Sequence, residues 1–171
     1  IELAGGKFSA TDNRTLSGTL SITADSELAV SEDHTLTLSQ TGGLSLGGNT
    51  LNLSGGGTLQ SGGLKLNNAS SKLLLNSITV DSVSTSADSL GLKIDNDTTI
   101  TSLSVSNLTP VSITDGKSLS GGITVNTGGI VQLSDNGTLA SNISISGGKL
   151  DADESLTVSG VVTQAGNATI N

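Results

Sequence analysis

The sequence predicts an all-β fold, a right-handed parallel β-helix (β-solenoid) with coils of about 20 residues, short strands and turns built from Gly, Asp and Asn. Three observations support this prediction. Aliphatic and polar residues alternate over short segments, glycine-rich clusters separate these segments, and the pattern recurs at intervals of about 20 residues. We expect 1–171 to be a single β-solenoid domain and a fragment of a longer repeat protein.

The composition restricts what the interior can contain. The 171 residues include 23 Gly and a single Phe, but no Trp, Tyr, Cys or Met. Any core must therefore be built from Leu, Ile, Val and Ala, whereas most globular cores use aromatic residues and Met to fill irregular gaps. An interior in which one small shape repeats suits regular layers of stacked strands.

Short strands are predicted wherever two aliphatic residues flank one polar residue, because side chains alternate between the two faces of a strand. No segment has the spacing of an amphipathic helix. Turns are expected at 41–43, 55–57 and 134–137, where Gly, Asp and Asn cluster, and a bulged loop is expected at 81–89. The predicted strands up to that loop are, in order, 20–22, 28–30, 36–38, 44–46, 51–53, 64–66 and 78–80.

A longer period links the strands of the second half of the chain. The same residue class returns every 20 residues, as an aliphatic ladder along a narrow interior requires. We therefore predict that Val111 and Ile113 stack on Val131 and Leu133 in the next coil. The predicted structural ladder consists of Leu103, Ile123 and Ile143 in one row and Val105, Val125 and Ile145 in another.

An antiparallel sandwich or barrel is the competing fold. In that fold, the Asp-Gly pair at 115–116 and the Asn-Gly pair at 136–137 would form hairpin turns. The β-solenoid is favoured because the strands are very short and the pattern repeats at the length of a coil rather than of a hairpin.

Two stretches carry a resemblance to a known group of proteins. They are GGGTLQSGGLKLNN (55–68) and SGGITVNTGGIVQLSDNGTL (120–139), in which GGITV (121–125) and GTL (137–139) match the repeat pattern residue by residue. This repeat pattern resembles the passenger-type β-helical repeats of bacterial autotransporter and adhesin surface proteins. The sequence lacks the Asn-Thr-aromatic segment that is common in those repeats. The resemblance implies an exported, elongated structural or adhesive segment.

Charge and composition argue against several classes of function. The formal net charge of −8 disfavours binding to nucleic acid. No apolar run reaches the roughly 18 residues that a membrane span needs, so we expect no direct membrane insertion. His34 is the only imidazole, Phe8 is the only aromatic residue, and the basic residues are scattered. We therefore expect neither an enzyme nor a bound cofactor.

Calcium is the metal that the acidic clusters could hold, because it takes six to eight oxygen ligands. The candidates are Asp95, Asp97, Asp151, Asp153 and Glu154. The simpler interpretation is that Asp and Asn initiate turns and charge the exposed surface. A calcium- or carbohydrate-binding module stays an alternative hypothesis.

A third hypothesis is an ice-binding β-solenoid, in which rows of Thr order water on a flat face. Thr-x-Thr occurs at 35–37 and 99–101, but we expect no common register. Our main hypothesis is a non-enzymatic stalk or self-associating rod of a secreted or surface-displayed bacterial protein. Its partners would be other copies of itself or other cell-surface molecules, since open coil ends present unpaired strand edges.

Overall fold

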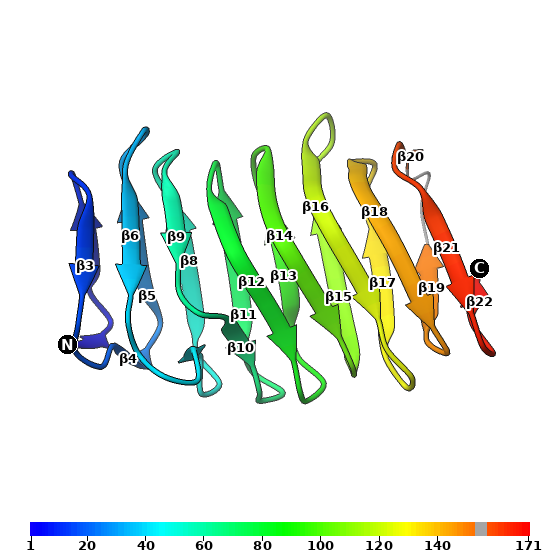
Figure 1. Ribbon diagram of the computed structural model, residues 1–171, viewed down its shortest axis with the longest axis horizontal. Coiled ribbons are helices and arrows are strands. Elements are labelled where there is room, and N and C mark those ends of the chain that lie inside the picture. The colour runs from blue at the N-terminus through cyan, green and yellow to red at the C-terminus, as the bar shows by residue number, and fades with distance from the viewer. Residues whose placement is uncertain (153–156) are drawn as a thin grey trace.

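The computed structural model describes residues 1–152 and 157–171 and shows an elongated β-solenoid. Parallel strands are stacked in about eight turns of roughly 20 residues, with the two termini at opposite ends of the rod (Figure 1). All paired strands run parallel, and the described residues contain no helix. The predicted β-solenoid is thus confirmed. The antiparallel alternative is wrong, because the Asp-Gly and Asn-Gly pairs lead from one face of a coil to the next.

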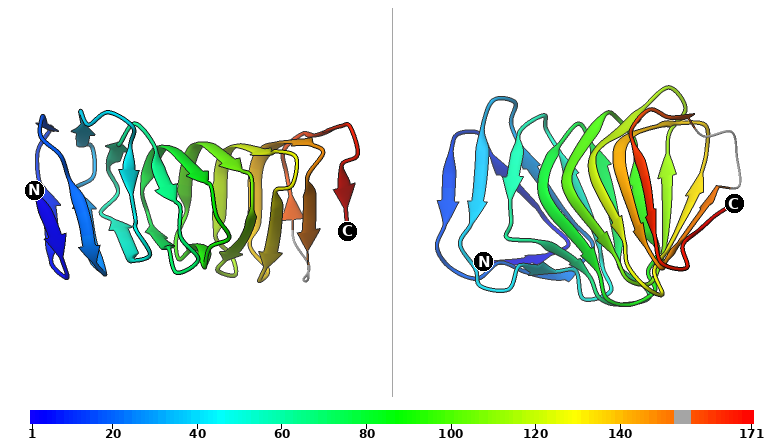
Figure 2. Two further views of the ribbon diagram at one scale, coloured as in Figure 1. Left: turned by 90° about the horizontal axis from the view of Figure 1, so that it is seen from below. Right: turned by 45° about the vertical axis from the view of Figure 1, so that its right-hand side comes forward.

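Each turn passes three faces, which the strand pairing defines. Figure 2 (right) looks partly along the rod and shows the chain tracing successive loops around a common interior. Face 1 is formed, in stacking order, by β2 (Lys7–Ala10), β5 (Ser26–Val30), β8 (Thr50–Ser54), β11 (Lys72–Asn76), β13 (Gly91–Ile94), β15 (Leu108–Ile113), β17 (Ile130–Ser134), β19 (Lys149–Ala152) and β22 (Thr169–Ile170).

The other two faces share four long strands, each of which bends from one face to the next. Face 2 is formed by β3 (Arg14–Leu16), β6 (Thr35–Leu38), β9 (Thr58–Gln60), the first parts of β12 (Thr79–Thr85), β14 (Thr98–Val105), β16 (Ser118–Val125) and β18 (Thr138–Ser146), and β20 (Thr157–Val158). Face 3 is formed by β1 (Glu2–Ala4), β4 (Ser21–Ala24), β7 (Leu44–Ser45), β10 (Leu64–Leu66), the second parts of β12, β14, β16 and β18, and β21 (Val162–Ala165).

The core is a set of aliphatic rows that run along the rod. Ile123 lies between Leu103 and Ile143, and Val125 lies between Val105 and Ile145. All six side chains are at most 3% exposed. Because equivalent positions meet every turn, Leu, Ile and Val of similar volume fill the interior without aromatic residues.

One long strand bends at a glycine. Gly121 in β16 has a φ of 118° and pairs with Ile100 of β14 in the preceding turn. A Cβ on Gly121 would lie 1.8 Å from the carbonyl oxygen of Ile100. Only a residue without a side chain fits here, since both the dihedral angle and the space exclude one.

The predicted register is wrong on face 1. Val111 pairs with Leu133, and Thr109 pairs with Val131, so that stretch is displaced by two residues from the expected alignment. The turn at 126–129 is longer than its counterpart in the preceding coil, and the turn at 135–137 is shorter. The two changes compensate, because Leu119 and Leu139 pair as expected on face 2.

The bulged loop expected at 81–89 is also wrong over its first half. Strand β12 continues through Val83 to Thr85, and both of these side chains point into the core. Asp81 lies at the bend of the strand, where its carboxylate accepts hydrogen bonds from Ser61 Oγ (2.9 Å) and the Gly62 N–H (2.9 Å). Asp81, which interrupts the alternation of apolar and polar residues, therefore marks a bend between two faces and not the start of a loop.

Face 3 is interrupted once among the described residues. β1 pairs with β4, and β7 pairs with β10, but no ladder joins β4 to β7. The other consecutive strands of this face are paired up to β21. This gap, which we call the β4–β7 gap, opens on the outer surface of the rod.

None of the described residues forms a helix long and apolar enough to cross a membrane.

Candidate functional site

The predicted calcium ligands are separated and already engaged. Asp95 pairs with Lys93 (Nζ to Oδ1, 2.8 Å), and Asp151 pairs with Lys149 (Nζ to Oδ2, 2.8 Å). Asp95 follows β13 and Asp151 lies within β19, three coils further on, which corresponds to about 14 Å along the rod. Asp153 and Glu154 lie outside the described residues. Within the part of the chain that the structure describes, no three His, Cys, Asp or Glu side chains come together as a metal site.

Several Asp and Asn side chains connect one coil to its neighbour. Asp97 Oδ1 accepts hydrogen bonds from the N–H and the hydroxyl of Ser118 (2.8 and 2.9 Å). Asp25 Oδ1 accepts from the Thr50 N–H (2.7 Å), and Asp88 Oδ1 accepts from the Leu108 N–H (3.0 Å). These carboxylates receive the first backbone donors of strands one turn away. The sequence interpretation of them as local turn initiators missed this role.

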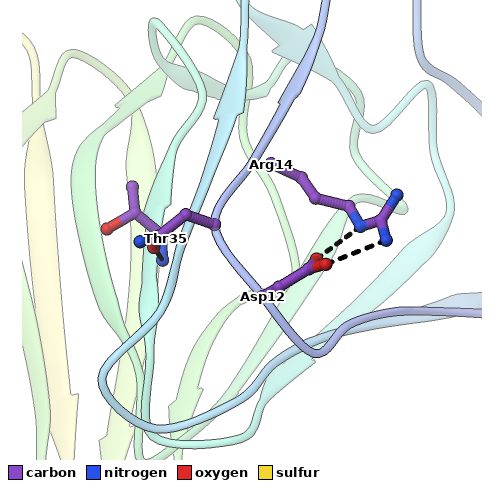
Figure 3. A network of polar contacts seen from close by, with 4 residues as sticks. Asp12, Arg14 and Thr35 are labelled. Atoms are coloured by element: carbon purple, nitrogen blue, oxygen red, sulfur yellow. Dashed lines mark hydrogen bonds and ion pairs between the residues drawn. The ribbon is translucent and has the colours of Figure 1, made fainter.

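Four ion pairs are present among the described residues, and one of them lies at a corner of the first coil. Figure 3 shows Arg14 and Asp12 facing each other beside Thr35 of the next coil. Arg14 donates to Asp12 through Nε (2.5 Å) and Nη2 (3.0 Å). Asn13, between them in the chain, accepts a hydrogen bond from the Thr35 N–H (2.8 Å). Both side chains of the ion pair are more than half exposed, so its contribution to stability is small.

The ion pair between Lys7 and Glu27 lies within face 1, since β2 and β5 pair there. Lys7 Nζ is 2.8 Å from Glu27 Oε1, and Ser54 Oγ donates to the same oxygen (3.0 Å). The hydrogen bond from Lys7 and then that from Ser54 lower the pKa of Glu27 below its ordinary value of 4.5. The charged form of Glu27 is therefore stabilised by the fold.

Glu27→Gln is expected to change the pH dependence of stability. A lowered folded-state pKa contributes stability above the unfolded value of 4.5 and loses it as pH falls through the folded value. The free energy of unfolding of the wild type should exceed that of the variant by at most about 1 kcal/mol at neutral pH. This difference in stability should shrink as the solution is acidified to about pH 3. Urea unfolding followed by far-UV circular dichroism measures it. Glu32→Gln, at an exposed turn, controls for the lost charge, and a pH-independent difference would contradict the expectation.

The outward side of face 2 carries a row of hydroxyl groups, which we call the threonine row. Thr35, Thr58, Thr79 and Thr99 pair in succession, and Ser120 continues the row. All five side chains are half-buried, and Thr99 Oγ1 lies 2.7 Å from Ser120 Oγ. Thr35 and Thr99, the first members of the two Thr-x-Thr pairs, thus share a register, whereas Thr37 pairs with Gln60 and the Thr-x-Thr pair as a whole does not recur. The unequal coil lengths of the first half of the chain concealed the shared register.

A second hydroxyl row runs along face 3. Ser84, Ser104, Thr124, Ser144 and Thr163 occupy equivalent positions in five successive turns. This row carries no charge. The outer sides of faces 2 and 3 thus each carry a row of small neutral groups at the spacing of the coils, about 4.8 Å.

His34 lies in the tight turn after β5, as the sequence suggested. Its backbone N–H donates to the Ser31 carbonyl (3.1 Å), and its carbonyl accepts from the Thr58 N–H (2.9 Å). The residue before it, Asp33, has a φ of 62°. The described contacts of His34 are thus those of a turn residue that links two coils.

Comparison of the chain with protein-family models, with curated proteins and with solved structures found no match.

Proposed function

We propose that the chain is a non-enzymatic structural and adhesive segment of a secreted or surface-displayed bacterial protein, acting as a stalk or self-associating rod. The observation that carries this proposal is the parallel ladder of face 1, which links every turn from β2 to β22. Continuous backbone pairing along the axis keeps the rod extended and protects the backbone from proteases. The β-solenoid fold and the Gly-Gly turns agree with the resemblance to passenger-type repeats.

Adhesion would use many weak contacts over a long surface. The two hydroxyl rows offer donors and acceptors at regular spacing, and each such contact adds little by itself.

Bead clustering and protease resistance test the proposal together. Beads coated with the chain should cluster in a concentration-dependent manner, and the free chain should resist thermolysin under native conditions. Resistance without clustering would favour a stalk over an adhesive rod. A chain that is neither protease-resistant nor able to cluster beads would overturn the proposal.

The threonine row favours a second candidate function, binding to ice. A flat array of hydroxyl and methyl groups at one repeated spacing can order water in the same repeat. If this is the function, the pure chain should depress the freezing point below the melting point of an ice crystal. Thr79→Lys, in the middle of the threonine row, should abolish most of this difference between freezing and melting points, whereas Thr124→Lys on face 3 should leave the difference unchanged. If the freezing and melting points do not differ measurably in the presence of the pure chain, ice binding is eliminated as a function.

A further inference from the structure

The outer side of face 1 carries lysines and aliphatic side chains in place of a hydroxyl row. In the row nearest face 3, Leu108 pairs with Ile130, and Ile130 pairs with Lys149. Leu108 is 37% exposed, and Leu90, just before β13 in the preceding coil, is 57% exposed. Ile130 is half-buried. Three successive coils in the middle of the rod thus leave aliphatic surface uncovered.

Lys72 is the lysine of face 1 that has no ion pair within the described part of the chain. It lies in the next row, beside Thr50 and Gly91. The buried Leu73 follows it in β11, so the Lys72 side chain points outward. Its ammonium group can therefore pair with a carboxylate of another molecule. The other lysines of the face each hold a carboxylate at 2.8 Å and are Lys7, Lys93 and Lys149.

Carboxylates gather at the edge where the chain leaves face 1 for face 2, which we call the acidic edge. Asp115 and Asp135 occupy it in successive coils and are exposed, and neither has an ion pair among the described residues. Arg14 and Lys117 lie at the same edge and offset only part of the negative charge. The described residues of the acidic edge are Asp12, Glu32, Asp33, Asp95, Asp97, Asp115 and Asp135.

The opposite edge, where the chain enters face 1 from face 3, is less negative. Its carboxylates are Asp25 and Asp88, and each accepts a hydrogen bond from a backbone N–H of the next coil. Lys72 and Lys149 begin strands on this side of the face. Face 1 is therefore polar across its width, with a basic and aliphatic side opposite the acidic edge.

We propose that two copies of the chain pack face 1 against face 1 with their rods parallel, so that the acidic edge of each copy covers the side of the other that carries Lys72 and Lys149. This inference rests on the self-association in the proposed function and assigns it a surface and a direction. A twofold axis along the rod brings opposite edges of the two faces together and keeps the coil order. A twofold axis along the strands would place one acidic edge on the other, which like charge disfavours.

The size of face 1 suits a specific but weak dimer. Its nine strands extend over about 40 Å at the spacing of the coils, and strands of about five residues give a width of about 16 Å. Contact over this area would bury about 600 Å² of each copy, or about 1,200 Å² in total, which is the lower end of the range for specific interfaces. Leu90, Leu108 and Ile130 would lose contact with water in it. Apolar burial thus supplies affinity, and charge selects the orientation.

Thiol cross-linking tests the orientation, because the chain contains no Cys of its own. Asn52 and Ser134 lie in one outward row of face 1, four coils apart. Equal coils face each other in the parallel dimer, so Asn52→Cys and Ser134→Cys should each be linked to itself by a bismaleimide that spans about 10 Å, the separation of packed sheets. Thr124→Cys, exposed on face 3, is the control and should stay unlinked.

Sedimentation velocity tests the charge argument. Lys72→Glu should raise the dissociation constant of the dimer about tenfold, because each of the two symmetric contacts loses an attraction and gains a repulsion. Lys65→Glu makes the same change of charge on face 3, where Lys65 is exposed, and should leave the dissociation constant unchanged. Equal effects of the two variants, or a wild-type chain that stays monomeric at about 100 μM, would overturn the proposal.

Two further outcomes separate this inference from the proposed function. Cross-linking of Asn52→Cys to Ser134→Cys only when the two variants are mixed would show antiparallel rods and overturn the orientation. Beads that cluster while neither variant is linked to itself would overturn the interface and leave the proposed function in place. Parallel dimers without bead clustering would support the interface and restrict self-association to rods that point the same way, as neighbours on one surface do.

Discussion

Gly121→Ala is expected to lower the free energy of unfolding by about 3 kcal/mol or more, enough to remove a large part of the stability of an ordinary domain. The added Cβ would lie 1.8 Å from the Ile100 carbonyl oxygen, in a backbone conformation with φ of 118°. Either the strand pairing of β14 and β16 must open or the bend between faces 2 and 3 must move. Both changes also disturb the aliphatic rows on either side of the bend.

The neighbouring glycine supplies the control. Gly122→Ala introduces the same atom one residue later, where the nearest atom, the Thr101 carbonyl oxygen, lies 3.3 Å away. This variant should lose less than about 1 kcal/mol. Urea unfolding followed by far-UV circular dichroism measures both variants, since the chain has neither Trp nor Tyr as a fluorescent probe. Equal losses in the two variants would contradict the steric argument.

Ile123→Ala is expected to cost about 2–5 kcal/mol. The side chain is 3% exposed and lies in a row between Leu103 and Ile143. The cavity would be flanked by a coil on each side, and both flanking coils are held by hydrogen bonds along the whole turn. They can collapse into the space only in part, which places the cost well above that of the lost transfer free energy alone.

Thr124→Ala, at the next position, tests whether the effect belongs to the interior. Thr124 points outward from the same strand and is exposed. Its removal should change the free energy of unfolding by no more than about 0.5 kcal/mol. Chemical unfolding of the two variants side by side decides the point. An Ile123→Ala variant as stable as Thr124→Ala would show that the row is not a packed core.

The fold could be predicted because it depends on features that a sequence displays directly. Alternation of Leu, Ile and Val with small polar residues placed the strands, and the 20-residue spacing from Leu103 to Ile123 and Ile143 placed the coils. The stacking of identical shapes also explains why aromatic residues are nearly absent. Local preference and global packing agree at these positions.

Other features were hidden because coil length varies where the core does not enforce it. Thr35 and Thr58 are separated by 23 residues but Thr79 and Thr99 by 20, so a search at constant spacing misses the threonine row. Turn residues can also be redistributed between corners, as the pairing of Val111 with Leu133 shows. Only the interior positions have a fixed geometry, and the turns adapt to them.

The β4–β7 gap could not be predicted at all. Its signal is an absence of pairing between β4 and β7, which leaves the alternation of Leu20 with Ile22 and of Leu44 with Leu46 intact. Gln40 and Asn49 are common residue types for turns, and nothing local indicates that they reach across to another coil. Contacts between residues 20 or 27 positions apart in the chain require the three-dimensional register.

Parallel stacking also limits where the rod can carry charge. A charged residue repeated in a row would place like charges about 4.8 Å apart, at a cost of about 1 kcal/mol per pair even in water. In the strand pairs of the described residues, two charged residues meet only once, as Lys7 with Glu27, and these have opposite signs. Most of the described acidic residues lie between strands, so negative charge follows the corners, whereas the strands of face 1 carry Lys7, Lys72, Lys93 and Lys149. Two rods lying side by side therefore repel each other most where corner meets corner, which gives lateral contact a preferred orientation.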